Sequence, residues 1–499
     1  VKDLDLMISG KYAGVGALIR YNFLLKNTVI DEPYENMPAA EVGLKKGDVI
    51  LAIGDSSMVG KDVAYVSNHL RGDAGTTFIL TIQRPSVNKK MKFKITRRAI
   101  QLPAVPYYGV QDCGVGYLNL NSFTTGCAKD VRRAFLDMKK QGMTSLVFDL
   151  RNNGGGSLQE AVNIVNMFVP KGITLVKTVG KMERANKEYK TTVEPIDTVM
   201  PIVVLVNDET ASASLITSGS LQDLDRAVVL GTRTYGKGLV QVSMDLPYNG
   251  NLKLTSSKYY IPSGRCIQAI NYKHANGGYT EHVPDSLTHV FHTANGREVR
   301  DGGGIKPDVE VRPDSLPNIA FYLASSGRDS TEVMWNWELQ YLKKHPTIVP
   351  AKTFVISDAD FEDFKQAVLK SGFKYDRESK KYLENLVKLA KFEGYYDDAK
   401  GEFDALEKKL NHNLAKDLDY NKQTLKKVLT SDLVSAYYYQ KGSLENSLQF
   451  DKQWKKAVEI LKNPAEYKKL LQPVVGQPLV KLEPASNVAV DKKQKSKAK

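Results

Sequence analysis

The middle of the chain alternates short apolar runs with helical stretches, and this alternation constrains the fold more than any other feature. Between Gly114 and Val311, four apolar runs have the length of buried strands, and helical patterns separate them. The predicted strands are Val115–Leu120, Ser145–Leu150, Ile202–Val206 and Ala227–Leu230, and the predicted helices are Lys129–Lys140, Leu158–Phe168 and Ala211–Gln222. Such alternation predicts an α/β layered domain.

The segment before this domain has a different pattern. Residues from Lys11 to Arg98 alternate short β-like runs with turn signals. A turn leads into an alternating strand within Gly43–Ile53, a short helix is predicted over Asp62–Leu70, and another strand over Thr77–Arg84. We therefore expect a small β-rich domain here.

After Pro313 the pattern becomes helical. Three stretches carry apolar residues at helical spacing, and a capping pattern, Ser357-x-x-Asp360, opens the first. We expect all three apolar stripes to pack in a core. They contain Phe361, Phe364 and Val368; then Leu383, Leu386, Val387 and Ala390; and then Phe403, Leu406 and Leu410. From Pro473 onward no period remains, which predicts a flexible tail.

Composition excludes several classes of protein. A chain of 499 residues is too long for one core and predicts two to four domains. No apolar run approaches the roughly 20 residues of a membrane helix. The cysteines, Cys113, Cys127 and Cys266, are odd in number and widely scattered, which excludes a disulfide framework and paired-cysteine metal knuckles.

The net charge of +14 does not indicate a nucleic-acid surface. Asp491–Lys499 alone carries five Lys against one Asp, in the predicted tail. Elsewhere Lys and Arg are interleaved with Asp and Glu, which is typical of a solvated surface. We therefore expect no nucleic-acid partner.

The first segment with catalytic potential is Asp149–Ser157, where a predicted strand runs into three glycines and then a helix. Backbone N–H groups can converge in such a turn at the positive end of the helix dipole. That geometry suits a phosphate or the oxyanion of acyl transfer. Taken alone, the segment fits a tight strand–helix turn better.

The second segment is Asn207–Leu215, where another predicted strand ends in polar and then small residues. A serine at a strand-to-helix turn is exposed, and the helix N-terminus stabilises a developing negative charge. The alternative is that Thr210 or Ser212 only caps the helix.

The third segment, Gly231–Gly238, nearly matches a P-loop but fails twice. Gly238 replaces the Mg²⁺-binding Ser or Thr, and Leu239–Met244 is predicted to form a strand where a P-loop needs a helix. What remains is Lys237 held between glycines. A desolvated lysine loses its charge readily and can act as a base near neutral pH.

The histidines do not provide an alternative base or a metal site. None of the seven stands in a nucleophile motif, and the spacing of the four between 274 and 292 fits no zinc pattern. A Ser–Lys pair is the interpretation that uses all three segments.

With these segments the chain resembles the carboxyl-terminal processing proteases, the tail-specific peptidases of serine protease family S41. The resemblance covers roughly residues 10–310 and rests on Asp149–Gly156, Thr210–Leu215 and Thr234–Gln241 in the family's order. A proline usual in the first motif is replaced by Gly154. The second motif begins with Thr and ends with Leu in place of the usual Ser and Glu.

The resemblance implies a role for each matching residue. Ser212 would be the nucleophile, Lys237 the general base, and Gln241 the residue that orients the lysine. Backbone N–H groups of Ala213 and Gly155 would bind the oxyanion. No metal or organic cofactor is implied.

The resemblance also implies a crotonase-like α/β fold for the core and settles a competition between two serines. Ser214 is the rival nucleophile, and the family pattern prefers Ser212. Tyr259–Gln268 matches a later family segment, for which we expect a structural role.

The β-rich segment resembles a PDZ domain, a module that binds a C-terminal carboxylate on loop N–H groups while the peptide adds a strand to the sheet. Gly14, Val15, Gly16 and Ala17 would form the carboxylate loop, and Leu18 would begin the pairing strand.

The expected architecture is therefore multidomain α+β. We predict a remnant of a trimmed segment at 1–10, a PDZ domain at 11–100, an S41 protease core at 101–312, a helical domain at 313–472 and a flexible basic tail at 473–499.

The expected function is that of a serine endopeptidase cleaving proteins at or near their C-terminal tails, with the PDZ domain binding the tail, gating the site, or both. The alternatives are a catalytically silent or autoinhibited PDZ scaffold and, with less support, a crotonase-like acyl-CoA enzyme. Expected partners are protein substrates with free apolar C-termini; an adaptor or activator and self-association are left open. The resemblance implies the bacterial cell envelope, with the periplasm as the expected compartment.

Overall fold

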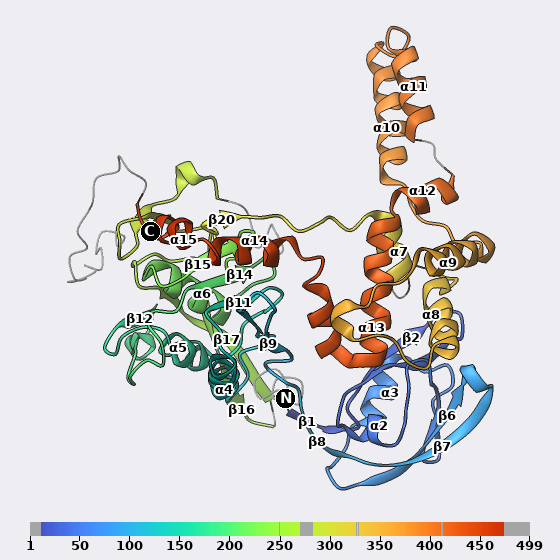
Figure 1. Ribbon diagram of the computed structural model, residues 1–499, viewed down its shortest axis with the longest axis horizontal. Coiled ribbons are helices and arrows are strands. Elements are labelled where there is room, and N and C mark those ends of the chain that lie inside the picture. The colour runs from blue at the N-terminus through green and yellow to red at the C-terminus, as the bar shows by residue number, and fades with distance from the viewer. Residues whose placement is uncertain are drawn as a thin grey trace. The chain divides into compact units, whose positions relative to one another are not determined.

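The computed structural model describes residues 11–248, 250–269, 283–325, 327, 329–410 and 413–473 (Figure 1). The chain forms two compact units. The core unit contains Leu102–Pro313 and the described part of Asp451–Lys499; the accessory unit contains Lys11–Gln101 and Asp314–Phe450. The chain therefore enters the core unit twice, the second time at Asp451. The predicted remnant and most of the predicted tail lie outside the described residues.

A six-stranded sheet forms the centre of the core unit, in the order β20-β15-β14-β11-β10-β9. All neighbours are parallel except β9 and β10. The strands are β9 (Tyr108–Val110), β10 (Val115–Asn119), β11 (Ser145–Asp149), β14 (Ile202–Val206), β15 (Val228–Gly231) and β20 (Val309–Glu310). The four strands predicted from apolar runs are β10, β11, β14 and β15. They are buried throughout, as parallel strands covered on both faces must be.

Helices cover both faces of this sheet. Three helices, α4 (Cys127–Lys140), α5 (Leu158–Val165) and α6 (Ala213–Asp223), share one apolar cluster with alternate residues of the strands, such as Phe148. The next residues along the strands point to the other face. There Tyr117 of β10 packs edge-on against Trp454 of α14 (Lys452–Leu461), with ring centroids 5.6 Å apart. The C-terminal helices α14 and α15 (Pro464–Leu470) therefore complete the core unit.

A smaller sheet of the core unit carries the segment after the near P-loop. Its order is β13-β12-β17-β16, and all neighbours are antiparallel. The strands are β12 (Thr174–Gly180), β13 (Lys187–Lys190), β16 (Leu239–Leu246) and β17 (Gly250–Tyr260), and a separate hairpin joins β18 (Val290–His292) to β19 (Glu298–Arg300). The strand predicted at Leu239–Met244 is confirmed as β16, which removes the P-loop interpretation.

The first part of the accessory unit is the expected β-rich domain. Its antiparallel sheet has the order β2-β3-β4-β6-β7, which leaves β2 as an edge strand, and β5 pairs with β4. The strands are β2 (Ala17–Asn22), β3 (Asn27–Pro33), β4 (Val49–Ile53), β5 (Ser56–Ser57), β6 (Thr77–Arg84) and β7 (Lys89–Thr96), while β1 (Lys11–Gly14) pairs with β8 (Arg98–Gln101). Two helices, α2 (Pro38–Glu41) and α3 (Val63–Leu70), complete it; Asp62 caps α3 as the predicted helix requires.

The second part of the accessory unit is helical. Its helices are α7 (Asn318–Ala324), α8 (Val333–Lys344), α9 (Asp358–Ser371), α10 (Glu378–Glu393), α11 (Lys400–Leu410), α12 (Leu414–Tyr420) and α13 (Lys422–Ser447). The capping box at Ser357 and Asp360 is present, and the stripe of α9 is buried as predicted. No helix in the described ranges is long and apolar enough to cross a membrane.

The predicted helical domain contributes to both units, and one expectation about its packing is wrong. Residues from Asp451 onward pack with the core unit, so the predicted span 313–472 is divided between the two units. The expectation that the apolar stripes of α10 and α11 pack in a core is wrong for most of their residues. Leu386 is 50% exposed and Leu406 is 42% exposed, although Leu383 and Ala390 are buried. These two helices project from the rest of the accessory unit as a hairpin (Figure 1), which leaves most of their apolar residues without a second layer to pack on.

Candidate active site

Ser212 lies half-buried at the turn between β14 and α6, in an unusual backbone conformation. Its φ and ψ are 56° and −116°, a region that a non-glycine residue occupies only when its surroundings enforce it. Ser212 holds the N-cap position of α6, yet its side chain makes no capping hydrogen bond. The hydroxyl is therefore not used to cap the helix, and its position at the helix N-terminus suits a reacting group.

Neighbouring hydroxyls have structural roles instead. Thr210 Oγ1 donates to Leu150 O at 3.0 Å and accepts from Asn207 N at 2.9 Å. Ser214 is fully buried, and its Oγ donates to Asn153 O at 2.9 Å. These bonds tie the turn of Ser212 to the loop that follows β11, and they remove Ser214 as an accessible nucleophile.

Lys237 lies just before β16, half-buried. Its Nζ donates to Gln241 Oε1 at 3.1 Å, so the structure joins these two predicted site residues. Burial, and then the positive charge of Lys253, lower the pKa of Lys237 below its ordinary value. The side-chain amide of Gln241 is neutral, so it adds no negative charge that would raise the pKa of Lys237 again. The environment therefore shifts Lys237 toward the neutral amine that a base requires.

Tyr259 of β17 connects the two segments that carry Ser212 and Lys237. Its buried hydroxyl lies 2.6 Å from Lys237 O and 3.1 Å from Ser212 O, and it donates to these carbonyls. Tyr259 lies in the segment Tyr259–Gln268, for which a structural role was expected, but no sequence pattern indicates this contact. The contact joins residues that are 47 and 22 positions apart in the chain, so it depends on the tertiary fold and not on a local pattern.

Gly155 packs directly against the turn of Ser212. Its φ is +98°, and a Cβ at this position would lie 2.7 Å from Ser212 Cβ and 2.8 Å from Ala213 N. Only glycine allows this approach. The structure thus brings both predicted oxyanion residues, Gly155 and Ala213, beside Ser212. The Gly155 N–H donates to Asn153 Oδ1 at 2.9 Å in this conformation.

The predicted carboxylate loop lies in the accessory unit, between β1 and β2. Gly16 has a φ of +72°, and a Cβ there would lie 2.5 Å from Met37 Cβ. Two backbone hydrogen bonds hold the loop: Tyr34 N donates to Gly16 O, and Ala39 N donates to Val15 O, each at 2.9 Å. Leu18, near the start of the edge strand β2, is 46% exposed. The loop, its glycines and the edge strand occur in the order that peptide addition requires.

No group of three or more His, Cys, Asp or Glu side chains in the described ranges is arranged to hold a metal ion.

Comparison with known proteins assigns three parts of the chain. The family models for "Peptidase family S41", "PDZ domain" and "Probable PDZ-protease, C-terminal helical domain" match residues 114–274, 29–84 and 322–461. The solved structure of a "photosystem II D1 C-terminal processing protease" is 28% identical over 61% of this chain and 73% of that chain, with a TM-score of 0.34.

Two curated relatives agree with these matches. A "Carboxy-terminal-processing protease" of Bartonella bacilliformis is 36% identical over 54% of this chain and 62% of its own length. A "Probable CtpA-like serine protease" of Staphylococcus aureus is 30% identical over 78% of this chain and 66% of its own length. The chain therefore spans between about half and two thirds of the curated relatives that it matches. By its three matched domains and these relatives, the chain belongs to peptidase family S41 and carries a PDZ domain.

Proposed function

We propose that this chain is a serine endopeptidase that cleaves proteins at or near their C-terminal tails through Ser212 and Lys237. The observation that carries the proposal is the contact of the Tyr259 hydroxyl with the backbone carbonyls of both Ser212 and Lys237. It joins the segment of a strained, uncapped serine at a helix N-terminus to the segment of a half-buried lysine of lowered pKa. Family membership supports the reaction class.

The proposed reaction begins with neutral Lys237. Its lone pair takes the proton of Ser212 Oγ while one of its N–H groups stays on Gln241 Oε1. Oγ attacks the scissile carbonyl, and the lysine then protonates the leaving amine, which gives an acyl-enzyme. A water molecule, deprotonated by the same lysine, hydrolyses the ester and restores Ser212.

The oxyanion formed in both steps would be stabilised by backbone N–H groups beside Ser212. Ala213 N is the first donor, because it follows the nucleophile at the start of α6. Gly155 N is the second, and its hydrogen bond to Asn153 Oδ1 would have to be shared or exchanged when the oxyanion forms.

The PDZ domain would select the substrate by its tail. A free carboxylate would bind the N–H groups of Gly14–Ala17, and the peptide would pair with the edge strand β2 alongside Leu18. An apolar tail matches the exposed leucine. The envelope location and any adaptor stay predictions.

Digestion of an unfolded model protein tests the proposal. One version carries a free apolar C-terminus and the other an amidated one, and wild type is compared with Ser212→Ala and Lys237→Ala. We expect wild type to cleave the free-tail version faster and both variants to lose cleavage. Cleavage retained in Ser212→Ala would remove the serine from the mechanism.

Tail recognition is tested with two exposed leucines of the same domain. Leu18→Asp should remove the preference for the free tail, whereas Leu24→Asp, in the turn after β2 and 53% exposed, should keep it. Loss of the preference in both variants, or in neither, would contradict the assigned groove.

A further inference from the structure

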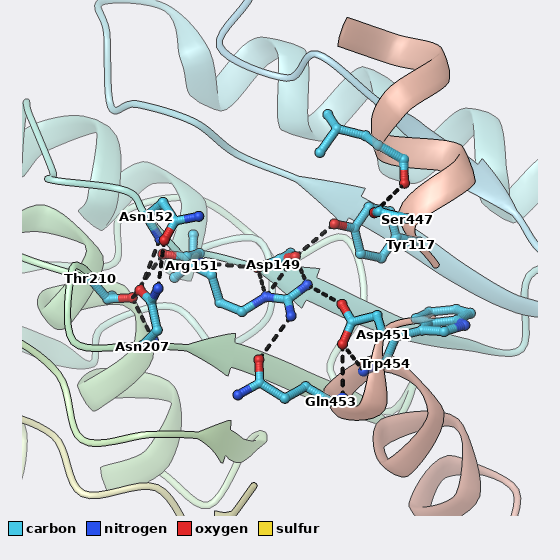
Figure 2. Close-up of polar contacts among 12 residues, drawn as sticks. Tyr117, Asp149, Arg151, Asn152, Asn207, Thr210, Ser447, Asp451, Gln453 and Trp454 are labelled. Carbon is cyan, nitrogen blue, oxygen red and sulfur yellow. Dashed lines mark hydrogen bonds and ion pairs between the residues drawn. The ribbon is translucent and has the colours of Figure 1, made fainter. Parts of the chain in front are cut away.

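Arg151 lies two residues beyond β11, in the loop that leads to Gly155. It binds one carboxylate from each of the two chain segments that form the core unit, Asp149 and Asp451. Its Nε donates to Asp149 Oδ1 at 2.9 Å, and its Nη2 lies 2.7 Å from Asp451 Oδ2. Its Nη1 donates to Gln453 Oε1 at 2.8 Å. Figure 2 shows the guanidinium between the β11 loop and the first turn of α14. Arginine presents a rigid planar set of donors, so these contacts fix its orientation.

The first turn of α14 is built to hold this position. Asp451 caps α14 by accepting from Gln453 N at 2.8 Å and Trp454 N at 3.0 Å, which leaves its other oxygen for Arg151. Gln453 is buried, and its Nε2 donates to Val311 O at 2.6 Å. The side-chain oxygen of Gln453 is thereby directed at Arg151.

A second connection runs through aromatic rings. Trp454 packs on Tyr117, whose hydroxyl donates to Asp149 Oδ2 at 2.6 Å. Asp149 is the residue that also binds Arg151. The Asp149–Arg151 pair is therefore contacted directly by Asp451 and Gln453, and by Trp454 through Tyr117 (Figure 2).

The loop after Arg151 is held by contacts with neighbouring segments. Asn152 has a φ of +59°, and strained residues persist only where surrounding contacts enforce them. Asn152 N donates to Asn207 Oδ1 at 2.9 Å. Asn153 O accepts from Ser214 Oγ, and Asn153 Oδ1 accepts from Gly155 N. A shift of Arg151 would pass along the backbone to Gly155, which packs against Ser212.

We propose that Asp451 and Gln453 are positioning residues, which hold Arg151 and, through it, the loop of Asn152–Gly155 in the conformation that supports catalysis at Ser212. This inference rests on the proposed function of that loop. It means that the active site is complete only when the C-terminal segment is seated on the core unit, although hundreds of residues separate the two in the chain. The seated segment begins at Asp451, where the chain leaves the accessory unit.

The decisive variant is Asp451→Asn in the full chain. Asparagine caps a helix as well as aspartate does, so α14 keeps its first turn while Arg151 loses a charged partner. The matched control is Asn463→Ala, which removes the cap of α15 (Asn463 Oδ1 accepts from Glu466 N) without touching Arg151.

Two readouts separate positioning from general loosening. With a short chromogenic peptide, we expect Asp451→Asn to lower kcat about tenfold or more with KM nearly unchanged, because small misplacements near reacting atoms are costly. The control should stay near wild type. A kcat for Asp451→Asn within twofold of wild type, or an equal loss in the control, would overturn the proposal.

Hydrogen exchange gives an answer that does not depend on catalysis. The amides of Asn152 and Gly155 should exchange faster in Asp451→Asn than in wild type or Asn463→Ala. If wild type shows no Ser212-dependent cleavage but these amides are loosened, the proposed function fails and the positioning contact stands. Unchanged exchange would contradict the positioning contact itself.

Discussion

Two lysines of this molecule, one in each unit, have opposite environments. Lys46 of the accessory unit lies 3.1 Å from Glu338 and above the ring of Trp335, whereas Lys237 of the core unit faces the neutral amide of Gln241. Both lose solvent, which by itself lowers a lysine pKa. What separates them is the charge of their partners.

Around Lys46, carboxylates outweigh desolvation. Burial would lower the pKa of Lys46, but Glu338, Asp432 and Asp31 raise it above its ordinary value. The pKa of Glu338 is also shifted. Burial and the negative charge of Asp432 raise it to about 8, although Lys46 acts in the opposite direction. Lys46 is therefore a permanent structural cation that joins the β-rich domain to α8. Around Lys237, no carboxylate of the described residues restores the charge, and Lys253 opposes it.

The largest expected difference comes from replacing each lysine with methionine. Lys46→Met removes the cation that Glu338 and Asp432 surround, and above pH 8, where Glu338 is ionised, it should destabilise the accessory unit by about 3 kcal/mol or more. Lys237 makes no ion pair with the residues that the structure describes, so Lys237→Met should change stability by less than about 1 kcal/mol, while cleavage falls by roughly 10³-fold or more. Denaturant unfolding followed by hydrogen exchange in each unit, together with a peptidase assay, measures both. Equal destabilisation by the two variants would contradict the assignment of Lys46 as a structural cation and of Lys237 as a lysine without such a role.

Gln241→Glu would give Lys237 a partner like that of Lys46. The new carboxylate should raise the pKa of Lys237, so the neutral base would form only at higher pH. We expect cleavage at pH 7 to fall about tenfold, with the rising limb of the pH–rate profile moved to higher pH and activity recovered at its alkaline end. An unchanged profile would show that Lys237 is not the base.

Glu338→Gln would test the other side of the comparison. Because the folded pKa of Glu338 lies near 8 and its ordinary value is 4.5, the folded state binds more protons between these values. Its contribution to stability is complete below pH 4.5 and is lost as pH rises toward 8. The variant should flatten this decline, measured as the free energy of unfolding of the accessory unit at pH 5 and 8. A slope equal to that of wild type would contradict the assignment.

Lys253→Gln should have the smallest effect. Removing this nearby positive charge should raise the pKa of Lys237 slightly and move the pH–rate profile toward higher pH. Lys253 is exposed, so high salt should abolish the difference by screening. Lys258→Gln, on the same strand, serves as the control and should leave the profile in place.

Local patterns in the sequence predicted much of the core. The apolar runs of β10, β11, β14 and β15 are recognisable because each strand is buried on both faces and ends in turn residues. Ser212 and Lys237 follow such runs, so motif and spacing were enough to nominate them, and their chemical roles stay predictions.

The rest depended on contacts between distant segments. The residues that flank Asp451 in the sequence do not indicate that its partner is Arg151. The capping pattern of α14 would be the same whichever part of the protein this helix packed on. Tyr259 likewise acts through two carbonyl groups, which carry no sequence signal. The stripe of α10 was predicted as core because periodicity shows which face is apolar but not whether a second layer covers it.

Covalent labelling tests whether Ser212 is a nucleophile activated by Lys237. The full-length chain would be treated with a fluorophosphonate, which modifies serines that are activated by a base, and the modified residue would be identified by peptide mass spectrometry. We expect a label on Ser212 that appears faster as pH rises and is lost in Lys237→Met. A label on another residue, or undiminished labelling of Ser212 without Lys237, would contradict it.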